Sequence, residues 1–520
     1  MYPDRDFDPS RELPASEPDV AADLELGTLL DVMAAGDTFL LDVARQGIHS
    51  GLASPAEITY RQHMLADCVA QPGAVRELYD LAVETVNAER QVFGFFWRDS
   101  PDTILYRTRQ VMDLYLTSLH RLADFAARQA PDFRSEGFTR FFAMLGSELT
   151  GEYFAEMEAD LADLGFRRGT LMSARLGKGG KGTGYVLRRH PPGRGWRDRL
   201  PGRNGTASYG FTVPERDEAG LRSLSELTSR AVSDTANALA QSADHIKSFF
   251  RLLRAELGFY LGCLNLREQL TARSQPVCFP VPAAVGDDRL SARGLYDASL
   301  ALTRGAGAGG EVVGNDVRAD GRQLIMITGA NQGGKSTFLR AVGQAQLMTQ
   351  AGMFVPAESL TASACSGVFT HFKREEDAAM EKGKLDEELD RMAAITKQIA
   401  PGGLLLCNES FAATNEREGS QIAREIIRAL TEAGVRIVFV THLYDLAWSC
   451  YQRNDGTALF LRAQREPDGS RTFRLPEGEP LPTSYGEDLY QAVFGPGTAG
   501  HPIAASADRT DGTGTTARSE

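Results

Sequence analysis

The chain has 520 residues, 42% of them hydrophobic and 24% charged, a composition typical of a globular protein with more than one domain. No window approaches the ~18 uninterrupted apolar residues of a membrane span. The start is acidic and proline-rich, so we expect a cytoplasmic protein without an export signal. The six cysteines form neither a CxxC pair nor a Cys/His cluster, which predicts reduced thiols and argues against a structural metal site.

The net charge of -13 argues against a polyanionic partner, but the charge is unevenly distributed. Between positions 167 and 203 there are eleven basic residues and one acidic residue, Asp198, so this segment carries +10. The rest of the chain therefore carries -23. A local basic surface of this kind can contact a polyanion even in an acidic protein.

Residues 1–24 lack apolar periodicity, and we expect them to be disordered. Residues 25–275 are predicted to form a mainly helical domain, because apolar residues recur at helical spacing up to Leu164 and again from Leu221 to Leu270. Residues 166–214 interrupt this pattern with short β-prone runs, glycines and prolines, which predicts hairpins or flexible arms. The basic segment therefore lies in a β-rich insertion between two stretches of long helix.

From residue 276 to residue 495, short apolar runs alternate with helical patterns. The runs are "QLIMIT", "GLLLCNES", "RIVFVTH", "ALFLRA" and "RTFRL". Apolar strands followed by helices predict an α/β domain with a mainly parallel sheet that is covered on both faces. Residues 496–520 are expected to form a disordered tail.

The stretch "GANQGGKS", residues 329–336, fits the pattern GxxxxGK[ST] between an apolar run and an amphipathic run. Glycines allow backbone N–H groups to turn toward phosphate oxygens, and the following helix adds the positive end of its dipole. Lys335 can reach the β- and γ-phosphates, and the Ser336 hydroxyl suits Mg²⁺. The predicted nucleotide-binding residues are Gly329, Ala330, Asn331, Gln332, Gly333, Gly334, Lys335, Ser336 and Thr337.

Two further strand ends are predicted to complete this site, so that Lys335, Glu409 and His442 are the candidate catalytic residues. Glu409 follows an apolar strand, where its carboxylate can polarise the attacking water. Asn408 stands where most such ATPases carry an aspartate for Mg²⁺, so we expect Ser336 and Asn408 to hold the metal with weaker magnesium dependence or slower turnover. His442 closes another strand and is either a sensor of the γ-phosphate or a satisfied polar residue; we favour the sensor.

These motifs and their order resemble the ATPase domain of the MutS mismatch-repair proteins. "ITGANQGGKSTFLRAV" is similar to the family loop TGPNMGGKST, "GMFVPAES" to a G-x-FVPA strand, and "NESFAATNEREGSQIA" to DE-x-GRGTST-x-DG-x-x-IA. "GNDV" resembles a PND turn ahead of the loop, and "FKREED", "FVTH" and "SYGEDLYQAVFG" have counterparts as well. The resemblance covers roughly residues 290–495.

The resemblance implies an α/β P-loop ATPase domain of the ABC type on the C-terminal side, with ATP and Mg²⁺ as cofactors. It also implies a homodimer whose two composite sites are completed across the subunits. In MutS relatives, lever helices leave the ATPase domain and carry a β-rich clamp that contacts DNA, which matches the order of helical domain and basic insertion here. The candidate DNA-binding residues are Arg175, Lys178, Lys181, Arg188 and Arg189.

The chain also departs from the family pattern. It is shorter than a full mismatch-repair MutS and has no room for the N-terminal mismatch-reading and connector domains. Phe154-Ala155-Glu156 has the letters of the Phe-x-Glu mismatch reader, but it lies in a helical pattern and is assigned to core packing. The trans-acting Gly-x-Ser-Thr-Phe-Met run appears as "KGKLDEELDRM" without the serine, where Lys382 or Lys384 could supply a cation across the dimer.

We therefore expect a MutS-like, ATP-hydrolysing and DNA-binding protein, a dimeric nucleotide-gated clamp in mismatch repair or related DNA maintenance. Two alternatives remain open. The same ATPase could act on branched DNA or on structured RNA such as a stalled ribosome. Alternatively, the chain could be a slowly hydrolysing, nucleotide-gated scaffold that recruits proteins, a function that Asn408 leaves possible.

Overall fold

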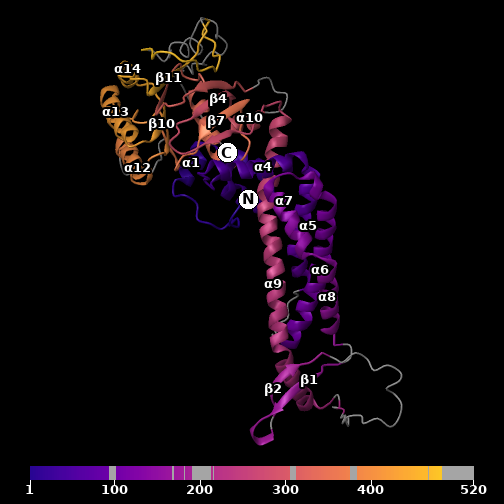
Figure 1. Ribbon diagram of the computed structural model, residues 1–520. Coiled ribbons are helices and arrows are strands. Elements are labelled where there is room, and N and C mark those ends of the chain that lie inside the picture. Colours follow the sequence, from indigo (N-terminus) through magenta and orange to yellow (C-terminus); the bar gives the residue numbers. More distant parts are fainter. Residues whose placement is uncertain are drawn as a thin grey trace, which may run out of the picture.

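The computed structural model describes residues 1–92, 101–166, 169–180, 182–189, 212, 214, 216–304, 312–374, 383–466 and 468–482. Figure 1 shows an elongated molecule in which a body with two β-sheets is continued by a helical stalk that ends in a small β-hairpin. The predicted mixture of helices and sheets is confirmed. Within the described ranges, no helix combines the length and apolarity needed to cross a membrane.

The N-terminal segment is ordered in the structure, so the expectation of disorder for residues 1–24 is wrong. The helices of this region are α1 (Glu17–Asp23), α2 (Leu26–Ala34) and α3 (Thr38–Ile48). Met1, Phe7 and Val20 are buried, and α1 lies against strand β8 (Val368–Phe372) of the body. Contacts with distant parts of the chain hold the segment in place. Its own sequence shows no helical periodicity over most of its length, so these contacts could not be predicted from it.

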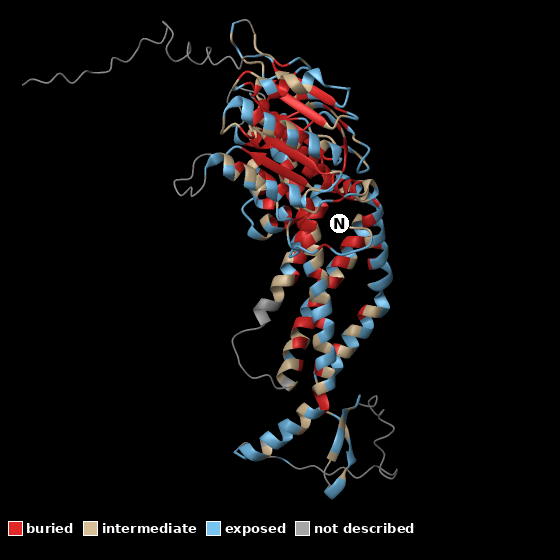
Figure 2. Ribbon diagram, turned by 90° about the vertical axis from the view of Figure 1, so that its left-hand side faces the viewer, coloured by how far each residue is buried: buried red, intermediate tan, exposed pale blue. Residues whose placement is uncertain are grey.

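The stalk is built around one very long helix, α9 (Glu218–Thr271). Packed against it are α4 (Pro55–Ala70), α5 (Pro72–Val92) and α6 (Pro101–Gln129). Helices α7 (Glu136–Glu148) and α8 (Gly151–Asp163) pack against α6, and α7 also contacts α4. Helix α9 has 54 residues and is therefore roughly 80 Å long. The Asp217 carboxylate caps it by accepting the Gly220 N–H at 2.9 Å. Figure 2 shows buried residues on the facing sides of the stalk helices and exposed residues on their outer sides.

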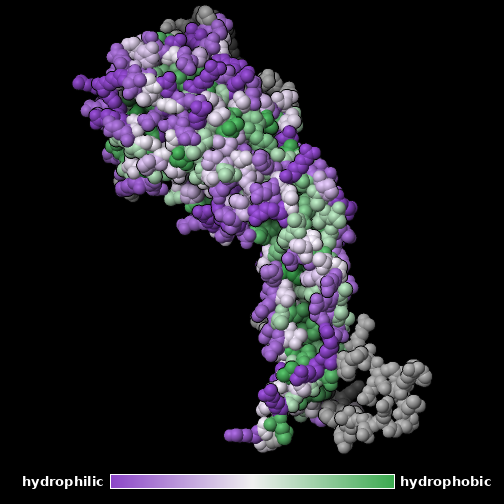
Figure 3. All heavy atoms as spheres, viewed as in Figure 1, coloured by the Kyte–Doolittle hydropathy of each residue, from purple (hydrophilic) through white to green (hydrophobic). Residues whose placement is uncertain are grey.

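Strands β1 (Met172–Leu176) and β2 (Gly182–Leu187) form an antiparallel hairpin at the far end of the stalk. Leu187 packs beside a small buried cluster that includes Leu105 of α6 and Val232 of α9. The expected β-rich interruption of the helices is therefore present, although residues 190–211 lie outside the described part. Figure 3 shows hydrophobic residues along the stalk near this hairpin, whereas the visible face of the body is mainly hydrophilic.

The body contains a five-stranded parallel sheet in the order β11-β6-β10-β9-β8. The other strands of this sheet are β6 (Leu324–Gly329), β9 (Leu404–Asn408), β10 (Arg436–Val440) and β11 (Ala458–Ala463). The body also contains the helices α11 (Lys335–Gln350), α12 (Lys384–Gln398), α13 (Glu416–Glu432) and α14 (Tyr444–Gln452). Four of the five predicted apolar runs are strands here. The fifth, residues 471–475, is not a strand: Arg471 forms only an isolated bridge with Arg465.

A second, four-stranded sheet lies beside the first in the order β3-β7-β4-β5. Its strands are β3 (Val281–Ala283), β4 (Leu290–Leu295), β5 (Asn315–Arg318) and β7 (Ser359–Ser363), with the short helix α10 (Ala298–Thr303) after β4. The "GNDV" stretch, which was expected to form a turn ahead of the glycine loop, is mainly strand, since all of its residues except Gly314 belong to β5. The proposed domain boundaries at residues 25, 275 and 495 stay a prediction.

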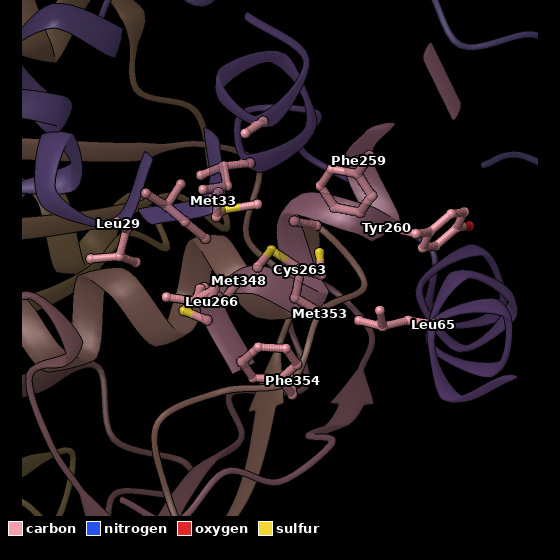
Figure 4. Packing of buried hydrophobic residues seen from close by; sticks show 14 of the residues in the cluster. Leu29, Met33, Leu65, Phe259, Tyr260, Cys263, Leu266, Met348, Met353 and Phe354 are labelled. Atoms are coloured by element: carbon pink, nitrogen blue, oxygen red, sulfur yellow. The ribbon is translucent and has the colours of Figure 1, made fainter. Parts of the chain in front are cut away.

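One hydrophobic core joins the stalk to the body. Figure 4 shows its side chains from α2, α4, α9, α11 and the segment that follows α11: Leu29, Met33, Leu65, Phe259, Tyr260, Cys263, Leu266, Met348, Met353 and Phe354. The contact between α2 and α9 is close, since a Cβ added at Gly262 would lie 3.4 Å from the Met33 Cβ. The Asn265 amide also donates to the Met33 carbonyl at 3.0 Å. Because Met348 of α11 belongs to the same core as the α9 side chains, the stalk packs onto the helix that follows the glycine loop.

Candidate functional site

The loop between β6 and α11 approaches strand β11 so closely that it requires glycine. A Cβ added at Gly329 would lie 2.8 Å from the Ala463 backbone nitrogen, and one at Gly333 would lie 2.7 Å from the Ala463 Cβ. Gly329 and Gly334 have φ values of 105° and 88°, which L-residues rarely adopt. Gly334 is also the N-cap of α11, so the loop delivers backbone N–H groups at a helix N-terminus.

Lys335 folds back over this loop. Its side chain is 5% exposed, and Nζ donates to the Gly329 carbonyl at 2.9 Å and to the Ala330 carbonyl at 3.0 Å. Burial lowers the pKa of Lys335, and the Glu409 carboxylate opposes that shift. The ammonium group is thus held at the loop by carbonyl oxygens, at the place where a phosphate would meet it.

Ser336 and Asn408 meet directly. The Ser336 Oγ donates to the Asn408 Oδ1 at 2.9 Å, which joins the first turn of α11 to the carboxyl end of β9. Both atoms are oxygens, the ligand type that Mg²⁺ prefers. The pair therefore fits Mg²⁺ in donor chemistry, but without the charge that an aspartate would add.

Glu409 follows β9 in a left-handed backbone conformation with φ 54°, which is uncommon for a residue with a side chain. Its N–H donates to the Val440 carbonyl at 2.9 Å. Its Oε1 lies 3.9 Å from Nδ1 of His442, which is too long for a hydrogen bond, and the two groups form an ion pair only when the imidazole is protonated. The His442 imidazole, followed by Lys335 and Lys373, holds the pKa of Glu409 below its usual range, so this carboxylate is ionised at neutral pH.

The structure thus brings together five predicted site residues from three separate motifs. The glycine loop supplies Lys335 and Ser336, the end of β9 supplies Asn408 and Glu409, and the end of β10 supplies His442. They lie at the carboxyl edge of β6, β9 and β10, which are neighbours in the parallel sheet. A cavity of about 730 Å³ opens at this edge and is lined by loop residues 331–337 together with Glu409. This volume lies within the range of ligand sites. The individual roles of these residues stay predictions.

The cavity is also lined by residues that the sequence did not single out for the site: Leu295, Tyr296, Asp297, Leu300, Arg304, Val312, Val313, Asn315, Phe338, Ala341 and Phe473. Asn315 belongs to the "GNDV" stretch, which could have identified it. Nothing in the local sequence marks Phe473, whose φ is 58° and whose carbonyl accepts from the Asn315 amide at 3.0 Å. The segment that carries it covers the loop, since the Arg471 Nε donates to the Asn331 carbonyl.

The candidate DNA-binding residues differ in their surroundings. Arg175 and Lys178 are exposed on the hairpin, and the exposed Arg188 donates to the Ser173 hydroxyl at 2.8 Å. Arg189 forms ion pairs with Asp160 and Asp163 of α8, so its charge is largely neutralised within the chain. Lys181 lies outside the described residues.

The interpretation of Phe154-Ala155-Glu156 as core packing agrees with the structure, because Phe154 is buried on α8 and its ring stacks 3.7 Å from the His120 ring. Lys384 begins α12, and its role across a dimer stays a prediction. Lys382, the second half of "FKREED" (375–377) and the segment "SYGEDLYQAVFG" lie outside the described part of the chain.

Two family models match this chain. The model of the MutS2 N-terminal domain matches residues 53–273, which include most of the stalk, and the model of MutS domain V matches residues 325–495, which include the five-stranded sheet and the candidate site. Together they define a protein in which a helical stalk is joined to a MutS-type α/β body. The chain belongs to the MutS family.

Individual relatives are similar over parts of the chain. The DNA mismatch repair protein MutS of Chloroflexus aurantiacus is 34% identical over 26% of this chain and 14% of its own length. Endonuclease MutS2 of Lacticaseibacillus casei is 30% identical over 51% of this chain and 32% of its own length, and MutS of Thermus aquaticus is 31% identical over 34% and 22%. The chain thus matches a third or less of the length of these relatives.

Proposed function

We propose that this chain binds and hydrolyses ATP and couples its nucleotide state to DNA binding. The observation that carries the proposal is the meeting of the glycine loop, Lys335, the Ser336–Asn408 pair and Glu409 around a single cavity. A glycine loop at a helix N-terminus suits phosphate oxygens, and a carboxylate at the carboxyl end of a nearby strand suits an attacking water. In this P-loop arrangement the loop follows β6 and the carboxylate follows β9, with β10 between them in the same sheet.

Each residue has a distinct part in the proposed reaction. Loop N–H groups and Lys335 bind the phosphates, and Lys335 exchanges its carbonyl partners for phosphate oxygens. Ser336 and Asn408 would hold Mg²⁺, which would supply positive charge for the phosphate oxygens. The ionised Glu409 accepts a proton from the attacking water. His442 lies near enough to Glu409 to orient the carboxylate, and it is the candidate sensor of the γ-phosphate.

We also propose a homodimer that acts as a nucleotide-gated clamp in the cytoplasm. The resemblance to ABC-type ATPases supports a site completed by a second subunit, with α12 and Lys384 as candidate contributors. The roughly 80 Å helix α9 supports a lever, because it runs from the body to a hairpin that exposes Arg175 and Lys178. These two residues would contact the DNA backbone, and their affinity would fall with salt.

The central test is the variant Glu409→Gln, which keeps the size of the side chain but removes the proton acceptor. It should bind ATP with near wild-type affinity and lose at least about 100-fold in turnover, so that an ATP-bound dimer accumulates in size-exclusion chromatography. The matched control is Glu418→Gln on the exposed start of α13, which should hydrolyse ATP normally. Full turnover in Glu409→Gln would refute the assignment of the base.

A second candidate function is the same ATPase acting on branched DNA or structured RNA. The buried position of Phe154 favours it, because the stretch that has the letters of the family's Phe-x-Glu mismatch reader is packed inside the stalk and does not offer its ring to a base. Gel shifts with matched, mismatched and branched DNA and with RNA duplexes, with and without ATP over a salt series, separate the candidates. Preference for a mismatch supports a repair sensor, and preference for a branched duplex or RNA supports the second function.

A further inference from the structure

A buried imidazole lies directly behind the candidate catalytic carboxylate. His371 on β8 is 0% exposed, and its register partner on β9 is Cys407, two residues before Glu409. Its Nδ1 lies 2.7 Å from the Ser410 hydroxyl, and its Nε2 lies 3.0 Å from the Glu388 carbonyl of α12. One side chain therefore connects strand β8, helix α12 and the residue that follows Glu409.

The hydrogen bonds assign the proton on this ring. A backbone carbonyl can only accept, so Nε2 carries the proton and donates to Glu388. Burial lowers the pKa of His371 to about 4, so the ring is neutral at pH 7. With Nδ1 unprotonated, the one hydroxyl proton of Ser410 is shared between two acceptors of His371, Nδ1 at 2.7 Å and the carbonyl oxygen at 2.8 Å. Ser410 is itself 0% exposed, so both contacts lie in the interior.

The turn held by this ring has an unusual backbone. Glu409 and Phe411 have φ values of 54° and 64°, both in the left-handed region. Where the chain has Phe411, the similar family segment DE-x-GRGTST has a glycine, which adopts such angles without strain. The Phe411 ring is 0% exposed and stacks on the His371 ring at 5.5 Å and 22°. Residues with side chains keep such a conformation only when the surrounding structure holds them there.

Helix α12 contacts the same turn from its other side. Burial raises the pKa of the Glu388 carboxyl, and the neighbouring Phe411 N–H opposes this shift, which places the side chain of Glu388 beside the turn. The Glu388 carbonyl is the acceptor of the His371 Nε2 proton. A displacement of α12 would therefore move the ring and, through Ser410, the backbone that directs Glu409.

We propose that His371 is a positioning residue that fixes the Glu409 carboxylate for hydrolysis through Ser410 and Phe411, and that links this carboxylate to helix α12. The inference rests on the proposed ATPase function. It assigns to His371 an effect on the chemical step and none on nucleotide binding, because the ring is fully buried and does not line the nucleotide cavity.

The test compares four single variants of the 520-residue chain, and the double variant of His371→Ala with Ser410→Ala, with the wild type in steady-state ATP hydrolysis. His371→Ala removes both hydrogen bonds, whereas His371→Gln can restore both, because an amide has an N–H donor and a carbonyl acceptor. Ser410→Ala removes the hydroxyl alone. His49→Ala is the matched control: His49 is an equally buried imidazole that does not line the nucleotide cavity. Affinity is measured separately with a fluorescent ATP analogue, and folding by circular dichroism.

We expect kcat of His371→Ala to fall about 10- to 100-fold, the loss that follows a small misplacement of a catalytic group, with KM and nucleotide affinity within about twofold of wild type. His371→Gln should recover most of this loss, and Ser410→Ala should show a similar loss that is not additive with His371→Ala. His49→Ala should keep the wild-type kcat whatever its effect on stability.

Several results would overturn the inference. They are an unchanged kcat in a folded His371→Ala, equal losses in His371→Ala and His49→Ala, and losses in KM instead of kcat. If His371→Ala does not fold, His371→Gln and Ser410→Ala decide: wild-type kcat in Ser410→Ala would refute the role of the hydrogen bond. A wild-type chain that does not hydrolyse ATP would instead overturn the proposed function, and this inference with it.

Discussion

Two buried imidazoles should make the folded protein less stable as the pH falls from 7 to 5. The side chain of His49 is 4% exposed and His371 is 0% exposed, and burial lowers the pKa of each to about 4. The Glu17 carboxylate opposes this shift at His49, and Arg45 adds to it. Arg391 adds to the shift at His371. In an unfolded chain the imidazole pKa is about 6.5.

The sign of the effect follows from which state binds the proton first. Between pH 7 and pH 5 the unfolded chain takes up most of a proton at each position, while each folded imidazole takes up about a tenth of one. This difference costs about 2 kcal/mol of folding stability per histidine by pH 5, and it levels off near 3 kcal/mol below the folded pKa. The stability that the neutral rings contribute is therefore present above pH 6.5 and is lost below it.

The measurement is urea unfolding followed by circular dichroism at pH 7 and pH 5, at constant ionic strength. His49→Asn and His371→Gln should each reduce the pH-dependent loss of apparent unfolding free energy by about 2 kcal/mol relative to wild type. His63→Asn, which removes an exposed imidazole, controls for the loss of a titrating group. Carboxylates that titrate in this range are shared by all variants and cancel. Equal pH dependence in wild type and both buried-site variants would show that the folded imidazoles take up protons over the same pH range as the unfolded chain, and would refute the reasoning.

Three further predictions concern the nucleotide site and the hairpin. Asn408→Asp restores a charged metal ligand and should lower the Mg²⁺ concentration for half-maximal ATP hydrolysis about tenfold, as measured by MgCl₂ titration; an unchanged midpoint would remove residue 408 from the metal site. Gly333→Ala adds a Cβ that would lie 2.8 Å from a loop carbonyl oxygen, so calorimetry should show ATP affinity reduced by at least about tenfold. The pair Arg175→Gln and Lys178→Gln should lower the salt slope of DNA binding by about two, whereas Arg189→Gln, which removes a residue already paired with carboxylates, should leave it unchanged.

The features that the sequence predicts well are those with local causes. The glycine loop is encoded by residues 329–336, since a φ of 105° at Gly329 and the close approach of Gly333 to β11 both demand glycine at those positions. The long helix α9 follows the apolar periodicity from Leu221 to Leu270 almost residue for residue. In each case the pattern and the structure that it requires lie within the same short stretch of chain.

The features that the sequence does not predict depend on contacts between distant residues. The N-terminal segment is ordered because Met1 and Phe7 pack into a hydrophobic core whose other residues come mostly from much later parts of the chain. His371 meets Ser410 because β8 pairs with β9 in a register that places His371 beside Cys407. Phe473 reaches the nucleotide cavity although its segment was predicted to be a strand. No spacing rule within one motif could identify these pairs.

The same distant contacts determine which parts of the protein can move with nucleotide. Helix α11 begins at the glycine loop, and Arg340 in its middle forms an ion pair at 2.7 Å with Asp297, which is 0% exposed and also lines the nucleotide cavity. At its end, the Ala351 carbonyl accepts from the fully buried Arg61 of α4.

Separating α11 from α4 would take the Ala351 carbonyl away from the fully buried Arg61 guanidinium, and leaving a buried charged donor without its partner costs about 3 kcal/mol. Helix α11 and the base of the stalk should therefore move together. In the proposed dimer, a nucleotide-dependent change would then begin in other elements, namely α12 and the segment that carries Phe473. Helix α12 is the element that His371 connects to Ser410, so a displacement of α12 would reach Glu409 through this residue.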